Sequence, residues 1–218
     1  MTAGWLSAQR HGRRSRVELT EQTASMLRTG AERIYGFGEP RDWDGRWLLV
    51  MLRVPEERRE VRHQVRTRLA WAGFGSLGGG LWISPHVERE AELRDMAGED
   101  SAAEMLSFRA KLGALGDPER LIADAWDLAA VADAYNDLIA SFGRMRPKTP
   151  EAVFRAQTLL VHAWRKFPFL DPDLPEGVLP SQWPRKRAHD VFQDRHAAWH
   201  GMAQDYFRSL EAVNRAAA

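Results

Sequence analysis

The sequence predicts an α+β protein in which a ferredoxin-like sheet, layered with helices, is followed by a helical region. Between about residues 41 and 117, segments with the apolar content of strands alternate with amphipathic segments. After Asp117-Pro118 the apolar spacing becomes wholly helical. Hydrophobic residues (44%) and charged residues (28%) occur in globular proportions, so the chain can bury enough apolar surface to fold.

The first forty residues are predicted to start with a hairpin whose tip is basic. Two apolar ends, Trp5-Leu6 and 17–19, flank a polar centre that contains a glycine, as two strands and a turn would. Thr20 then offers an N-cap for a short helix, which we expect to break at Gly30. The basic residues of the hairpin are Arg10, His11, Arg13, Arg14 and Arg16.

This basic cluster has two interpretations. One is contact with the phosphates or the narrow minor groove of DNA, which arginine suits by its planar fork of donors. The other is a solvated basic hairpin. We favour DNA contact, because the net charge of the whole chain is only +1 and the basic charge is concentrated in this segment.

Residues 41–117 are predicted to form a β-α-β-α-β unit. A strand runs from Trp43 to Pro55, and a helix follows whose apolar residues recur at intervals of three and four. After a turn at Gly78–Gly80 come a second strand at 81–85, a helix from about 86 to 98, and a third strand near 105–112. That third strand alternates, so we expect one buried face, formed by Leu106, Phe108, Ala110 and Leu112. This order favours a ferredoxin-like fold.

The remaining residues, 118–218, are predicted to be helical. Apolar spacing indicates helices at about 128–142, 151–166 and 188–210. The proline-rich segment between the last two is too apolar for a free linker, so we expect it to wrap the helices. The basic run Arg185-Lys186-Arg187 has the chemistry to bind phosphate, but we favour solvated charges.

Several function classes are excluded or disfavoured. The absence of cysteine excludes disulfides, thiolate zinc sites and a cysteine nucleophile. No apolar run approaches the roughly 20 residues of a membrane span, and we expect a cytoplasmic protein. The sequence contains no nucleophile-elbow, P-loop or dinucleotide fingerprint, so we expect neither an enzyme nor a cofactor.

Two candidate metal sites are also disfavoured. A nuclease would need a metal held by acids such as Asp42, Asp44, Glu56 and Glu57, but these pairs lie at opposite ends of the predicted strand, about 40 Å apart. His196 and His200 have the spacing of two zinc ligands on a helix, and His189 lies seven residues before His196. Because no third ligand is evident, we expect surface or interface histidines.

The order of four segments resembles the PaaX-type transcriptional repressors. These segments are GWLSAQRHGRRSRVELT, WDGRWLLVMLRVPEERREVRHQVRTRLAWAGFGSLGGGLWISP, FRAKLGALGDPERLIADAWDL and FLDPDLPEGVLPSQWP. The resemblance implies part of a winged-helix domain at 1–40, a ferredoxin-like domain at 41–117 and a helical domain at 118–218. It also implies a homodimer that binds operator DNA and releases it when an aryl-coenzyme A or related acyl thioester binds.

The resemblance leaves two functions open. Met1 lies only a few residues before the wing, so the recognition helix of such a repressor is not in the sequence. The chain is then either a repressor or a relative that senses ligand or dimerises without specific DNA binding of its own. A coenzyme A site could include His162, Trp164, Arg165 and Lys166, with cations on phosphates and an aromatic wall. We favour the alternative, an ordinary helix end whose cations complement the macrodipole.

Overall fold

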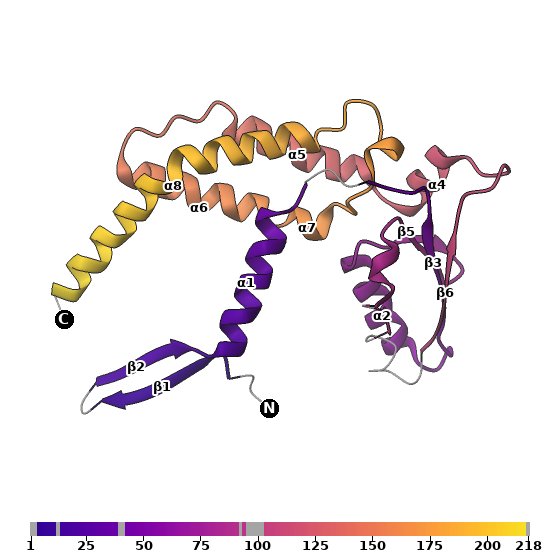
Figure 1. Cartoon of the computed structure of the whole chain (residues 1–218), viewed down its shortest axis with the longest axis horizontal. Coiled ribbons are helices and arrows are strands. Elements are labelled where there is room, and N and C mark those ends of the chain that lie inside the picture. Colours follow the sequence, from indigo (N-terminus) through magenta and orange to yellow (C-terminus); the bar gives the residue numbers. More distant parts are fainter. Residues whose placement is uncertain (1–3, 12–13, 39–41, 92, 95–102, 217–218) are drawn as a thin grey trace. The chain divides into compact units, whose positions relative to one another are not determined.

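The computed structural model describes the backbone of residues 4–11, 14–38, 42–91, 93–94 and 103–216. The chain divides into two compact units, Met1–Glu39 and Pro40–Ala218. Figure 1 shows the first unit as a hairpin followed by one helix, and the second as a sheet with helices and a larger set of helices.

The first unit is a two-stranded antiparallel hairpin, β1 (Leu6–His11) and β2 (Arg14–Leu19), followed by α1 (Glu21–Tyr35). The Thr20 hydroxyl caps the helix by accepting from the Thr23 N–H, and it lies 3.0 Å from the Gly4 carbonyl oxygen, to which it can donate. The predicted hairpin and N-cap are therefore confirmed. The predicted break at Gly30 is wrong, because α1 continues through it. One interior glycine costs a helix only about 1 kcal/mol, which a good cap offsets.

The second unit begins with an antiparallel sheet of four strands. They are β3 (Trp47–Arg53), β4 (Gly75–Gly78), β5 (Leu81–Ser84) and β6 (Glu104–Ala110), in the order β4-β5-β3-β6. Helix α2 (Arg59–Trp71) connects β3 to β4, and a short helical turn, η1 (Val87–Arg89), follows β5. The predicted ferredoxin-like fold is confirmed. Strand β4 was not predicted, because four residues with two glycines look like the end of a helix and a turn.

The two faces of this sheet are covered differently. On one face, Leu48 and Val50 of β3 pack against Val65 and Leu69 of α2. On the other face the covering residues are Ile122 of α4 (Pro118–Ala125) and Leu174, which form a cluster with Trp47 and Ile83. Residues of α2 and of α4 therefore contact opposite sides of the same central strand.

The buried face predicted for the third strand is wrong. Phe108 is 53% exposed and Leu106 is 43% exposed, although the register pairs them with the partly buried Leu49 and Met51. Leu112 lies beyond the strand and is also exposed. The reason is topological: β6 is an edge strand, and the residues that cover this face pack on β3 and β5.

The helical part contains α5 (Leu128–Phe142), α6 (Pro150–Trp164), the short α7 (Phe167–Leu170) and the long α8 (Arg185–Ala216). A single turn, η2 (Glu176–Val178), lies in the proline-rich segment before α8. Asp127 and Thr149 cap α5 and α6, and α8 packs along both helices (Figure 1). Helix α8 begins three residues before the predicted start and continues past 210. Within the described chain, no helix has the length and apolar character needed to span a membrane.

Candidate functional site

The first candidate site is the basic hairpin of the first unit. Its register pairs His11 with Arg14, Arg10 with Ser15, and Gln9 with Arg16. Because successive strand positions alternate between faces, positions 11, 14 and 16 belong to one face and position 10 to the other. Arg13 lies outside the described residues. The backbone thus brings four of the five predicted basic residues to the end of one hairpin.

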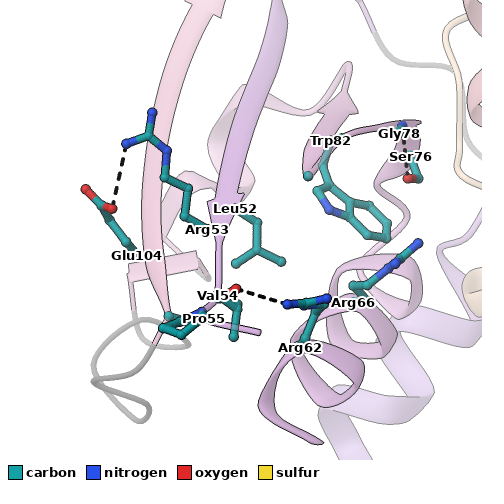
Figure 2. Close-up of a pocket in the computed structure, with 13 residues that line it drawn as sticks. Leu52, Arg53, Val54, Pro55, Arg62, Arg66, Ser76, Gly78, Trp82 and Glu104 are labelled. Atoms are coloured by element: carbon teal, nitrogen blue, oxygen red, sulfur yellow. Dashed lines mark hydrogen bonds and ion pairs between the residues drawn. The ribbon is translucent and has the colours of Figure 1, made fainter. Parts of the chain in front are cut away.

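The second candidate site is a cleft of about 930 Å³ in the ferredoxin-like domain, which we call the arginine cleft (Figure 2). It is lined by the end of β3, by α2, by the β4–β5 turn and by the start of β6. Its charged lining residues are three arginines and one acid, Arg53, Arg62, Arg66 and Glu104. Its other lining residues are Leu52, Val54, Pro55, Ser76, Gly78, Gly79, Gly80, Trp82 and Ala103.

The fold explains where these arginines lie. Arg62 and Arg66 are four residues apart on α2, a spacing that puts them on the same side of the helix. Arg53 ends β3, where the sheet register pairs it with Glu104 of β6. The guanidinium of Arg53 lies 3.9 Å from the Glu104 carboxylate, whereas Arg62 donates to the Val54 carbonyl at 3.3 Å. Among the described residues, the Arg66 side chain has neither an ion pair nor a hydrogen bond.

The glycine turn forms one wall of the arginine cleft. Gly78, Gly79 and Gly80 all have positive φ, at 82°, 57° and 83°, a conformation that residues with a side chain adopt only at a cost. A Cβ at position 80 would also collide with the Leu52 carbonyl oxygen. The Gly80 carbonyl accepts from the Leu52 N–H at 2.8 Å, which fixes the turn against β3. The turn predicted from the three glycines is confirmed.

The four residues named for a coenzyme A site do not lie in one environment. Trp164 is fully buried, and its ring stacks on Phe192 with centroids 4.6 Å apart. His162, Arg165 and Lys166 are exposed near the end of α6, and the Lys166 amine lies 5.7 Å from the centre of the Phe167 ring. The arrangement puts the aromatic residue in the helical core and the three polar residues at the surface.

The four acids considered for a nuclease, Asp42, Asp44, Glu56 and Glu57, are all exposed. Asp44 accepts from the Arg46 backbone N–H at 2.9 Å and from its guanidinium at 2.6 Å, and these hydrogen bonds lower the pKa of Asp44. Glu56 and Glu57 are exposed beyond the end of β3. His196 and His200 stack with centroids 5.1 Å apart. No group of three or more metal-ligating side chains occurs among the residues that the structure describes.

A buried ionic cluster in the helical part was not predicted. The Arg185 guanidinium donates to both carboxylate oxygens of Asp171, at 2.9 and 2.8 Å, and it lies 3.3 Å from Asp173. The Tyr135 hydroxyl donates to the same Asp171 carboxylate at 2.6 Å. Burial first, and then the charge of Asp171, raise the pKa of Tyr135 far above its ordinary value. The expectation that Arg185 is solvated is therefore wrong. Its side chain is buried and pairs with Asp171, fourteen residues earlier in the chain.

Two family models match consecutive parts of the chain. The PaaX protein central Cas2-like domain matches residues 40–122, and the PaaX-like protein C-terminal domain matches residues 126–209. The chain belongs to the PaaX family. It is 31% identical over 192 residues to the transcriptional repressor PaaX of Escherichia coli (strain K12), an alignment that covers 83% of this chain. The aligned part spans 60% of the length of that curated relative.

A solved structure shares this PaaX-family fold. The uncharacterized protein Rv0674 from Mycobacterium tuberculosis has a TM-score of 0.61 and is 21% identical, over 93% of this chain and 78% of its own. The arginine cleft lies within the part matched by the central Cas2-like domain, because its lining residues run from 52 to 104. The hairpin and α1 lie before residue 40, outside both matched ranges.

Proposed function

We propose that this chain is a PaaX-type transcriptional repressor that contacts operator DNA through its basic hairpin. The observation that carries the proposal is the antiparallel hairpin itself, which gathers basic residues at one end of a separate compact unit. Membership of the PaaX family supports it, as does the similarity to a protein named as a transcriptional repressor. Arginine contacts of this kind position a protein on the DNA backbone, whereas base contacts specify sequence.

The proposed regulation is release of DNA when an aryl-coenzyme A or related acyl thioester binds. The thioester is the effector that the family resemblance implies, and phenylacetyl-coenzyme A is the probe that the family name suggests. The proposal also includes a cytoplasmic protein without catalytic activity. Regulation of this type requires that the thioester and DNA bind with opposite preferences for two states of the protein.

A homodimer is part of the proposal. It is supported by Leu106 and Phe108, which expose an apolar strip on an edge strand of the ferredoxin-like sheet. Exposed apolar patches of this kind often mark protein interfaces. We expect a dimer in analytical ultracentrifugation and a shift to monomer in the variant Phe108→Lys. A monomeric wild-type chain at micromolar concentration would contradict this part of the proposal.

The experiment that tests DNA binding is fluorescence anisotropy of the purified chain with the promoter DNA of its own operon and with scrambled DNA, over a salt series. The test variant replaces Arg10, Arg14 and Arg16 with glutamine. A control variant replaces Arg155, Arg187 and Arg208, which are exposed arginines of α6 and α8, and so changes the net charge equally.

The expected result is that the wild-type chain prefers promoter DNA and that the hairpin variant alone loses affinity. Each lost phosphate contact should reduce the slope of log K against log salt by about 0.9. Equal losses in the two variants would show that net charge, not the hairpin, drives binding. Weak, salt-sensitive binding without preference for the promoter would instead support the alternative function, a ligand-sensing or dimerisation module.

A further inference from the structure

We infer that the arginine cleft is a binding site for the phosphate groups of a phosphorylated small molecule. The inference starts from charge. The guanidinium groups of Arg62 and Arg66 lie on the α2 side of β3, whereas the Arg53 side chain points to the other side of the strand, where it meets Glu104 (Figure 2). Arginine is the side chain best suited to phosphate, because its planar fork can donate two parallel hydrogen bonds to one phosphate group.

The existing contacts of these arginines leave donors for a ligand. The Arg66 side chain has no hydrogen bond or ion pair among the described residues, and that of Arg62 makes a single hydrogen bond to the Val54 carbonyl. The 3.9 Å ion pair of Arg53 and Glu104 joins two side chains that are both more than 60% exposed. This pair lies on the other side of β3 from α2, so the Glu104 carboxylate does not compete with a phosphate for Arg62 and Arg66.

The shape of the arginine cleft favours a small molecule over a nucleic-acid backbone. Its volume of about 930 Å³ lies within the range of about 300–1,000 Å³ that is usual for small-molecule sites. Duplex DNA presents its phosphates on a convex surface, which a hollow of this kind does not match. Leu52, Pro55 and Trp82 add apolar wall beside the arginines, so the site suits a molecule with an apolar or aromatic part as well as phosphates (Figure 2).

The walls of the arginine cleft are held by the fold before any ligand arrives. The hydrogen bond between the Leu52 N–H and the Gly80 carbonyl fixes the glycine turn on the end of β3. Trp82 is only 5% exposed and packs in the core between the sheet and α2. A preformed site loses less conformational entropy on binding than one that must be ordered.

The identity of the ligand as an acyl-coenzyme A thioester rests on the proposed function. Coenzyme A carries a diphosphate and a 3′-phosphate, together with an adenine ring, so it has the chemistry that the arginine cleft recognises. The cleft would then be the place where the effector acts on the repressor.

The test is isothermal titration calorimetry of the full chain with coenzyme A, phenylacetyl-coenzyme A and inorganic pyrophosphate. The test variant is Arg62→Gln/Arg66→Gln, which removes the two guanidinium groups that α2 presents to the cleft and leaves the apolar core residues unchanged. The control is Arg59→Gln/Arg68→Gln, which removes two charges from the same region on residues that do not line the cleft. Circular dichroism melting of each variant checks that the fold is intact.

We expect the Kd of each phosphorylated probe to rise at least tenfold in the test variant and to change less than threefold in the control, since a hydrogen bond to a charged group contributes enough for such a change. Pantetheine, which has no phosphate, should bind test variant and wild type alike. Equal Kd values for the phosphorylated probes in the test variant and the wild type would overturn the inference.

Two further outcomes separate this inference from the proposed function. If phenylacetyl-coenzyme A binds and releases promoter DNA equally in the wild type and the test variant, the regulation holds and the site lies elsewhere. If pyrophosphate and coenzyme A bind in the cleft but no thioester affects DNA binding, the phosphate site holds and the proposed regulation fails. A loss confined to duplex DNA binding would assign the cleft to nucleic acid and overturn the inference.

Discussion

Arg185 holds both carboxylate oxygens of Asp171 in the interior of the helical part, although the two residues lie fourteen positions apart. Asp171 ends a four-residue helix, and Arg185 begins the longest helix of the chain. The Arg185 guanidinium also donates to the Leu174 carbonyl at 3.1 Å. Because Leu174 is fully buried in the cluster with Trp47 and Ile83, the ion pair fixes a segment that packs on the ferredoxin-like sheet.

Breaking this pair should destabilise the protein strongly. We expect Arg185→Ala to lower the free energy of unfolding by about 3–5 kcal/mol, because it leaves the Asp171 carboxylate buried without its charged partner. The control is Lys186→Ala, since Lys186 is exposed and forms an exposed ion pair with Asp190, one turn along α8. That change should cost less than about 0.5 kcal/mol. Urea unfolding followed by circular dichroism measures both, and similar midpoints for the two variants would show that the pair is unimportant for stability.

His86 should make stability depend on pH. Its ring lies 3.2 Å from the Pro172 carbonyl oxygen and is buried. Burial, and then the charge of Arg89, lower the pKa of His86, against the opposing effects of Asp173, Glu88 and the Pro172 carbonyl. The unfolded chain therefore binds the proton more readily than the folded chain. By linkage, the contribution of His86 is present above the ordinary histidine pKa of about 6.5 and is lost as pH falls below it.

The variant His86→Gln isolates this effect, because the two proteins differ only at this residue. We expect the wild-type chain to exceed the variant in unfolding free energy at pH 7.5, and the difference to shrink steadily towards pH 5. Urea unfolding at five pH values provides the comparison. A difference that stays constant over this range would mean that His86 does not change its pKa on folding.

Two glycines with the same backbone conformation should respond differently to alanine. Gly45 and Gly80 have φ of 79° and 83°, but a Cβ at Gly45 meets nothing within 4 Å, whereas one at Gly80 collides with the Leu52 carbonyl. Gly45→Ala should therefore cost only the strain of the left-handed conformation, about 1–2 kcal/mol. Gly80→Ala should cost clearly more and should shift the glycine turn. If thermal unfolding shows equal losses of stability in the two variants, the backbone around Gly80 and Leu52 shifts to admit a Cβ without further cost.

The sequence predicted the elements whose signals are local. The spacing of Val65 and Leu69 identified α2, and the oxygen of Thr20 identified the start of α1. Strand β4 was missed because its pairing with β5 is a property of the sheet, not of its four residues. The arginine cleft was missed for a similar reason, since only the packing of α2 on the sheet places Arg62 and Arg66 beside the end of β3 and the glycine turn.

The buried position of Arg185 did leave a signal in the sequence. A cation in the first turn of a helix opposes the helix dipole, so an arginine there needs a separate reason. Two aspartates, Asp171 and Asp173, lie in an otherwise apolar segment shortly before it. These two local conflicts, taken together, point to a buried pair. The basic run of 185–187 hid the signal, because such runs are usually solvated.

The final prediction concerns Trp164 and Lys166, which the sequence had placed in one possible ligand site. Trp164 is fully buried between Phe192 and Phe167, so Trp164→Ala should remove a large core side chain and cost about 3–5 kcal/mol. Lys166 is exposed, and Lys166→Ala should leave stability within about 0.5 kcal/mol of the wild type. Urea unfolding measures the stability of the Trp164→Ala variant. The Kd of coenzyme A for the Lys166→Ala variant tests whether Lys166 takes part in binding. Because Lys166 lies outside the arginine cleft, that Kd should stay within threefold of the wild-type value. A tenfold rise would instead place the phosphate groups at the end of α6 and argue against the cleft.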